Sequence, residues 1–90
     1  MSHVIHDAPR LTPRVKRLKG QVAALEKALA GEPECLAVLT QIAAIRGAAQ
    51  SLLLEVLEGH MQSHVAEEKN PAARRAEVAA LNKILRSYLK

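Results

Sequence analysis

The chain has 90 residues and a net charge of +4, and its 49% of hydrophobic residues include one Tyr, no Phe and no Trp. A chain this short has room for one domain, residues 1–90, and helices without large aromatic side chains bury so little surface that we expect subunits to associate. There is no run of about 18 uncharged apolar residues and no apolar signal peptide, and one cysteine excludes an intrachain disulfide, so we expect a cytoplasmic protein without a membrane span.

The charges are segregated along the chain. Residues 1–30 carry six basic and two acidic groups, residues 31–68 carry one basic and six acidic groups, and residues 69–90 carry six basic and one acidic group. Basic ends around an acidic middle indicate that part of the surface meets a polyanion, although basic runs can also simply solvate helices.

The first predicted helix covers residues 13–30. Thr12 before Pro13 is typical of an N-cap followed by a first-turn proline, and Gly31 is typical of a helix stop. The residues before it, 1–10, are expected to form a flexible N-terminal arm. An apolar seam for a partner helix is predicted by spacings that alternate between three and four, at Val15, Leu18, Val22, Leu25 and Leu29.

The second predicted helix opens at Pro33 and continues to about Ala66, because nothing between them is punctuated strongly enough to end it. At 1.5 Å per residue it would be about 48 Å long. Asn70 and Pro71 repeat the cap-and-proline signal and open a third helix that runs to the C-terminus. Its seam comprises Val78, Leu81, Leu85 and Tyr88. The fold class is therefore all-α, a three-helix chain with a long central helix.

Four residues have the chemistry of metal ligands: His3, Cys35, His60 and His64. The last two are spaced i, i+4, which puts both imidazoles on one helix face, as binding of one ion requires, although two partly exposed histidines would look the same. Cys35 lies in the first turn of the second helix, where the helix dipole favours the thiolate that metals and electrophiles need. Alternatively, Cys35 is a small hydrophobic residue buried in the interior.

Cys35 and His60 are 25 residues apart, which is about 37 Å along a continuous helix, so one chain cannot bring both to one ion. If two copies of the helix pack antiparallel about a twofold axis, Cys35 of one copy meets the two histidines of the other, and symmetry makes two identical sites. Small residues occupy the crossing point midway between them: Ala43, Ala44, Gly47, Ala48 and Ala49. We expect an antiparallel dimer with two intersubunit sites, which a hairpin at Gly47 would contradict.

One sulfur with two or more imidazoles suits Ni(II), Co(II) or Zn(II) better than Cu(I). His3 could join from the arm as a further nitrogen ligand. The free amine of Ser2, if Met1 is removed, and the carboxylate of Glu34 could add donors that favour six-coordinate nickel or cobalt over zinc. The zinc-protease motif, His-Glu-x-x-His, is absent because Met61 stands where the motif needs glutamate after His60. No nucleophile triad or phosphate-binding loop is present. The sequence therefore does not indicate an enzyme.

The candidate DNA-binding residues are basic or amide side chains of the first two helices: Arg10, Arg14, Lys16, Arg17, Gln21 and Arg46. Arg14, Arg17 and Gln21 lie within about 60° of one another at 100° per residue, and Arg10 extends the stripe if the helix begins a turn earlier. Because the chain has one aromatic residue, the stacking platform that binds single strands is missing, which favours duplex DNA. Phosphate contacts would dominate the affinity.

Over essentially its whole length the sequence resembles the CsoR/RcnR/FrmR family of small all-helical bacterial repressors. The most specific segments are RVKRLKGQVAALEKAL, QIAAIRGA, EVLEGHMQSH and LRSYLK. The resemblance implies a disc-like tetramer, a dimer of dimers in which antiparallel second helices form each dimer. It also implies repression at an operator with a G/C tract and inverted repeats, with DNA contacts at Arg14, Arg17, Lys16 and Arg46.

Copper-responsive members of the family that this chain resembles have Cys, His and Cys at the positions where this chain has Cys35, His60 and His64. Formaldehyde-responsive members typically have an N-terminal proline and an acidic residue in the place of His64, whereas residue 2 here is Ser. With His3, the set is most like the nickel/cobalt-responsive subgroup, which implies that Ni(II) or Co(II) releases the DNA and derepresses a metal efflux gene. Two alternatives stay open: a formaldehyde-responsive repressor that senses through the Cys35 thiolate, and a structural or nucleoid-type helical oligomer.

Overall fold

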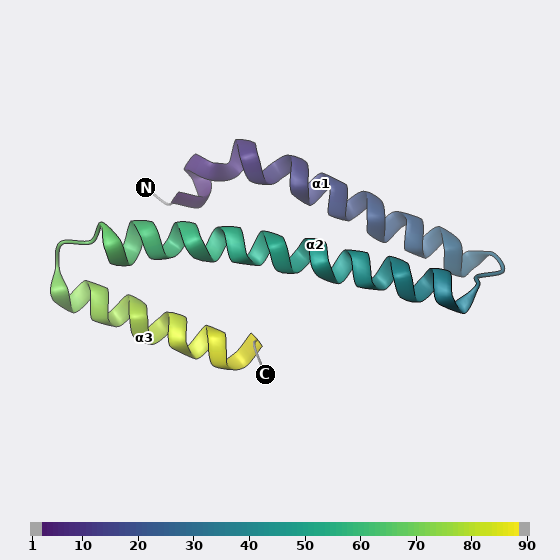
Figure 1. Cartoon of the computed structure of the whole chain (residues 1–90). Helices are drawn as coiled ribbons and strands as arrows, with labels where there is room; N and C mark the ends of the chain where they lie inside the picture. The colour runs from purple at the N-terminus through teal and green to yellow at the C-terminus, as the bar shows by residue number, and fades with distance from the viewer. Residues whose placement is uncertain (1–2, 89–90) are drawn as a thin grey trace. The chain divides into compact units, whose positions relative to one another are not determined.

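The computed structural model describes the backbone of residues 3–88 and the side chains of residues 4–88. It contains α1 (His3–Ala30), α2 (Cys35–Met61) and α3 (Pro71–Tyr88), and a π-helical segment, η1 (Gln62–Ala66), continues α2 (Figure 1). No strand occurs in this part of the chain, which confirms the all-α, three-helix fold. Contacts divide the chain into two compact units, one ending at Val56 and the other beginning at Leu57.

α1 begins at His3, so the predicted start at Pro13 is wrong. Pro9 and Pro13 both lie inside the helix. Each lacks the N–H that the helical hydrogen-bond ladder needs, and α1 bends near its N-terminal end in Figure 1, as prolines inside a helix require. The early turns persist because Leu11 is buried. The single domain, residues 1–90, and the flexibility of residues 1–10 stay predictions.

The turn between α1 and α2 follows the sequence signals closely. α1 ends at Ala30, and the N–H of Gly31 donates to the carbonyl oxygen of Ala28 at 3.2 Å. No described glycine has a positive φ, so Gly31 ends the helix without the left-handed conformation expected of a C-cap glycine. α2 begins two residues after Pro33, and the carbonyl oxygen of Glu34 accepts a 3.0 Å hydrogen bond from the N–H of Val38.

Within the first unit, α1 and residues 35–56 of α2 lie side by side and share a heptad seam (Figure 1). The covered residues of α1 are Asp7, Ala8, Leu11, Arg14, Leu18, Gln21, Leu25 and Ala28, and those of α2 within this unit are Val38, Gln41, Ile45, Ala48, Leu52, Glu55 and Val56. Of the predicted seam, Leu18 and Leu25 are covered, whereas Val15, Val22 and Leu29 are 48%, 49% and 57% exposed. They form a second apolar stripe that the unit does not cover.

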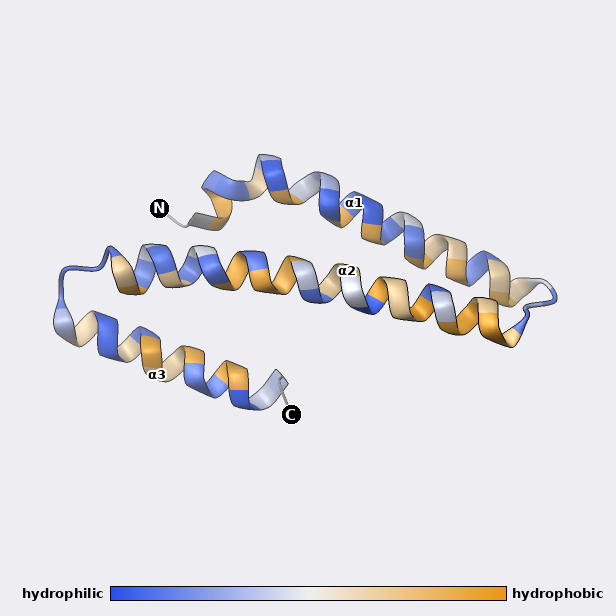
Figure 2. Cartoon of the chain, viewed as in Figure 1, coloured by the Kyte–Doolittle hydropathy of each residue, from blue (hydrophilic) through white to orange (hydrophobic). Residues whose placement is uncertain are grey.

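Part of the surface of α2 is apolar and exposed in the described part of the chain, at Leu36, Leu39, Ile42, Leu53, Leu54 and Met61. None of its residues is buried, and the ribbon of α2 is orange at many positions in Figure 2, where the residues are hydrophobic. By length and composition alone, Cys35–Ala66 would be apolar enough to cross a membrane, a property it shares with the core helices of soluble proteins. α2 continues through Gly47 without a hairpin, and a Cβ added at Gly47 would meet nothing within 4 Å.

The second unit contains the end of α2, η1 and α3. Asn70 caps α3 as predicted, because its Oδ1 accepts hydrogen bonds from the N–H of Ala72 at 2.9 Å and of Ala73 at 3.3 Å. Pro71 is the first helical residue. Of the predicted seam, Leu81 is buried and Leu85 is half-buried, while Val78 and Tyr88 are exposed. In the described chain the buried hydrophobic residues are Leu11 and Leu81, each 8% exposed.

Candidate functional site

The structure brings the two predicted histidine ligands together at the end of α2. The ring centroids of His60 and His64 are 4.5 Å apart, and the rings are tilted by 44°. His60 lies in the last turn of α2, whereas His64 lies in η1. A π-helical turn closes a wider hydrogen-bonded ring than an α-helical turn and is often found at functional sites. Both side chains are half-buried, so the pair forms a partly desolvated site with two nitrogen donors.

Glu77 of α3 contacts His60, and it was not among the residues predicted from the sequence. Its Oε2 lies 2.7 Å from Nε2 of His60, and the two side chains are 35% and 31% exposed. Because this contact uses Nε2, a metal ion bound together with it would sit on Nδ1 of His60. The available signal was that Glu77 is the one acidic residue among the six basic residues of segment 69–90.

Cys35 forms no disulfide and is exposed at the first turn of α2, beside the exposed Glu34. It belongs to the first unit, and His60 and His64 belong to the second. Ser2 lies outside the described residues, and so does the side chain of His3. Among the side chains of residues 4–88, no three His, Cys, Asp or Glu side chains gather as a metal-binding group. The donors present, a thiol and a close imidazole pair, fit a borderline divalent metal.

Two of the candidate DNA-binding residues are held by one acidic side chain of α2. Nε of Arg10 lies 2.9 Å from Oε1 of Glu55, and Nη1 of Arg14 pairs with Oε2 of the same carboxylate. Nη2 of Arg14 also donates to the hydroxyl oxygen of Ser51. Nη2 of Arg10 lies 3.6 Å from Oδ1 of Asp7. The N-terminal end of the predicted basic stripe is therefore an ion-pair network between α1 and α2.

The other candidate DNA-binding residues have different environments. Lys16, Arg17 and Arg46 are exposed, and none makes an ion pair with another described residue. Gln21 lies in the heptad seam, where its Oε1 is buried and has no hydrogen-bond partner within residues 4–88. The exposed cations can meet a phosphate directly, whereas Gln21 faces inward within the unit.

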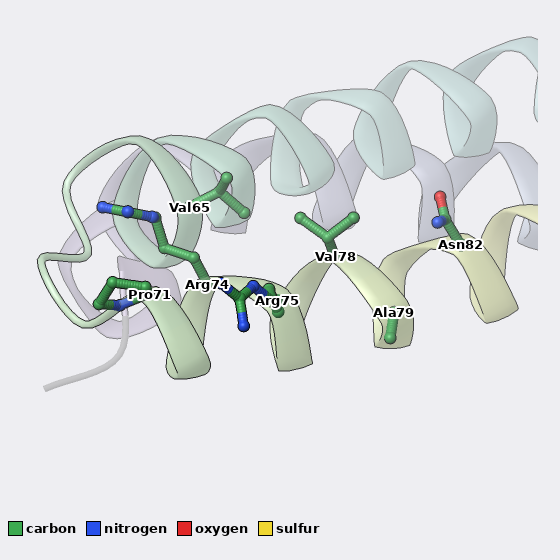
Figure 3. Close-up of a pocket in the computed structure, with 7 residues that line it drawn as sticks. All are labelled: Val65, Pro71, Arg74, Arg75, Val78, Ala79 and Asn82. Carbon is green, nitrogen blue, oxygen red and sulfur yellow. The ribbon is translucent and has the colours of Figure 1, made fainter.

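An open groove beside the start of α3 holds none of the predicted ligands. Val65 of η1 and Val78 of α3 point toward one another across it, and Arg74 and Arg75 lie at one end (Figure 3). Arg74 donates from Nη1 to the carbonyl oxygen of Glu68 at 2.8 Å. The lining is mostly apolar and contains no acid, thiol or imidazole, so the groove has no catalytic group.

Residues 7–87 match the family model described as metal-sensitive transcriptional repressor. Over 90 residues the chain is 44% identical to the transcriptional repressor RcnR of Salmonella typhimurium strain LT2, with both chains fully covered. It is 48% identical over 91 residues, again with full coverage of both, to an uncharacterized protein in the bioA 5′ region of Serratia marcescens.

A solved structure is similar to this chain over almost its whole length. It is a variant of the formaldehyde-responsive regulator FrmR from Salmonella enterica serovar Typhimurium in which one glutamate is replaced by histidine. The TM-score is 0.84 and the identity 43%, with 97% of this chain and 99% of the other covered. The three-helix fold is thus shared with a solved structure.

Proposed function

Because the chain belongs to the family of metal-sensitive transcriptional repressors, we propose that it binds operator DNA in its metal-free form and releases it when Ni(II) or Co(II) binds. The observation that carries this proposal is the imidazole pair of His60 and His64, with ring centroids 4.5 Å apart. Two imidazoles at this separation suit binding of one ion. The release of DNA derepresses a metal efflux gene, and the repressor acts in the cytoplasm.

The proposed metal ligands come from two copies of the chain. α2 is continuous from Cys35 to Met61, and at 1.5 Å per residue its geometry separates residues 35 and 60 by about 37 Å. An ion that uses both Cys35 and His60 therefore takes them from different chains. The exposed apolar side chains of α2 and the open space at Gly47 support an antiparallel dimer, and we propose that two dimers form the tetramer.

We propose His3, Cys35, His60 and His64 as the ligand set, with the amine of Ser2 and the carboxylate of Glu34 as further donors. When bound, the ion supplies bonds that fix these side chains, and with them two α2 helices, relative to one another. Glu77 orients the ring of His60 by accepting from Nε2. The nitrogen-rich ligand set and the relatives named RcnR support nickel or cobalt. Zn(II) would bind the same types of donor atom but needs only four ligands.

The proposed DNA contacts are the exposed cations Lys16, Arg17 and Arg46, together with Arg10, Arg14 and Gln21 near the α1–α2 seam. His3 is the first residue of α1, so fixing its imidazole constrains the start of the helix that carries the arginines. Linkage makes the effect reciprocal, because DNA must weaken metal binding by the same factor, commonly about 5–150-fold.

A second candidate function is a formaldehyde-responsive repressor, which the exposed thiol of Cys35 and the similarity to the FrmR variant support. In this reaction the sulfur adds to the carbonyl carbon, the thiol proton goes to the carbonyl oxygen, and a hydroxymethyl thioether forms without a leaving group. Incubation with formaldehyde, followed by intact mass and DNA-binding measurements, tests this alternative.

Titration of Ni(II), Co(II), Zn(II) and Cu(I) into the protein–DNA complex tests the main proposal. The DNA is a duplex from the region directly upstream of the coding sequence, and a random duplex of equal length is the control. We expect Ni(II) or Co(II) to release the DNA, with absorption spectra that report the coordination number. If formaldehyde but no metal releases the DNA, the second candidate replaces the first.

A further inference from the structure

We propose that Glu55 is an internal competitor of DNA phosphate: its carboxylate holds Arg10 and Arg14 against α2, and operator binding requires that it release them. The inference rests on the proposed DNA-binding role of these arginines and adds a residue that sets the affinity of that site. Glu55 is neither a proposed metal ligand nor a proposed DNA contact.

The geometry supports competition because each oxygen of one carboxylate faces the guanidinium of a different arginine. Oε1 of Glu55 lies 2.9 Å from Nε of Arg10, and Oε2 pairs with Nη1 of Arg14. Arg14 has a further acceptor in the hydroxyl of Ser51. Guanidinium groups bind carboxylates and phosphates with the same forked N–H geometry, so the donors that hold Glu55 are those a phosphate would use.

Burial makes the carboxylate the fixed partner of this network. The side chains of Glu55 and Asp7 are both 21% exposed, whereas those of Arg14 and Arg10 are 39% and 62% exposed. Glu55 and Arg14 both occupy heptad seam positions. The arginines can therefore swing outward on their long side chains, while Glu55 stays in the seam.

Charge gives the network its effect on DNA. Asp7 and Glu55 balance Arg10 and Arg14, so this end of the basic stripe presents no net charge while the pairs are intact. Lys16 and Arg17 carry no such compensation among the described residues. Breaking one partly exposed ion pair changes the DNA affinity by at most a few-fold. The pairing of both arginines with Glu55 therefore weakens DNA binding by about three- to tenfold.

The test compares Glu55→Gln with Glu26→Gln in the metal-free full-length protein. Glu26 is an exposed acid of α1 without an ion pair to another described residue. Both substitutions remove one negative charge, so the two variants have the same net charge. DNA binding to the upstream duplex is measured by fluorescence anisotropy at several salt concentrations. We expect E55Q to bind about three- to tenfold more tightly than the parent, and E26Q to change by less than about twofold because solvent and salt screen a distant charge.

Two further readouts identify the arginines as the cause. Because the parent releases the same arginines on binding, E55Q and the parent should give the same slope of log affinity against log salt, whereas the Arg10→Gln, Arg14→Gln double variant should lose up to about 1.8 from it, at about 0.9 per phosphate contact. In an Arg10→Gln, Arg14→Gln background, E55Q should behave like E26Q. Circular dichroism checks the fold. If E55Q is not folded, Glu55→Asp replaces it. The shorter side chain keeps the charge but moves the carboxylate away from the arginines, so DNA binding should tighten by about twofold.

The inference is overturned if E55Q, or E55D in its place, binds no more tightly than its control, because Glu55 would then position the arginines instead of competing for them. A parent protein that binds the upstream duplex, and loses affinity in the arginine double variant, leaves the proposed function intact in that case. A parent that does not bind DNA, or that is indifferent to loss of both arginines, overturns the proposed function or its contact residues as well.

Discussion

Nε2 of His60 lies 2.7 Å from Oε2 of Glu77, and this contact joins the last turn of α2 to α3 within the second unit. An imidazole with one nitrogen held by a carboxylate has a defined tautomer and ring orientation. The proposed ligand His60 is therefore fixed by a residue that is not itself in the ligand set.

Replacing Glu77 should weaken metal binding without removing a ligand. We expect Glu77→Ala to lower Ni(II) affinity by about 10- to 100-fold, because the ring of His60 loses its orienting acceptor. Glu77→Gln keeps an acceptor oxygen and should lose less. Competition with a chelator measures the affinity. Glu58→Gln, at an exposed acid of α2, is the control, and equal behaviour of all three variants would remove Glu77 from the site.

Mixing two inactive variants should restore metal binding if each site is shared between chains. Cys35→Ala and His60→Ala each damage both sites of their own dimers. A mixed dimer has one intact site, made by the cysteine of one chain and the histidines of the other, so random mixing should restore about a quarter of the parent's sites. Metal content after co-refolding measures this. Restoration of none would mean that the sites are not shared in this way.

His3 should transmit the signal more than it binds the metal. We expect His3→Ala to keep most of the metal affinity and to lose most of the coupling, which is commonly about 5–150-fold, because the start of α1 is no longer tied to the ion. DNA affinity with and without Ni(II) gives the coupling factor. His6→Ala, at an exposed histidine of the same helix, is the matched control. A His3 variant that releases DNA as fully as the control would show that α1 is controlled from elsewhere.

Asn70 should stabilise the second unit through its cap. Asn70→Ala removes the acceptor of two backbone N–H groups, and we expect the free energy of unfolding to fall by about 1 kcal/mol. Urea denaturation at fixed protein concentration measures it. Asn82→Ala, at an exposed site inside α3, should cost nothing, so similar losses in both variants would contradict the capping role.

The local signals of the sequence were sufficient for the end of α1, the start of α3 and the histidine pair. Asn70-Pro71 and Gly31 mark helix ends where the structure has them, because the capping hydrogen bonds involve residues within three positions of one another. The i, i+4 spacing of His60 and His64 was enough for their proximity, although the turn between them is partly π-helical.

Contacts between helices were not predictable in the same way. The Thr12-Pro13 signal failed because burial of Leu11 extends α1 beyond it, which is a tertiary effect. Glu77 and Glu55 were missed because their partners lie 17 or more residues away, at distances set by the turns between helices. Arg14 and Gln21 were read as surface residues, since an apolar pattern alone does not reveal polar side chains at seam positions.

The scarcity of buried hydrophobic residues affects how the protein folds. With Leu11 and Leu81 as the buried hydrophobic residues of the described chain, an isolated copy has little to offset the entropy lost on ordering its helices. If the proposed dimer forms, folding and assembly are a single reaction whose extent depends on protein concentration. Dilution should melt the repressor, its midpoint temperature should climb with concentration, and a cell that makes few copies would hold a large share of them unfolded.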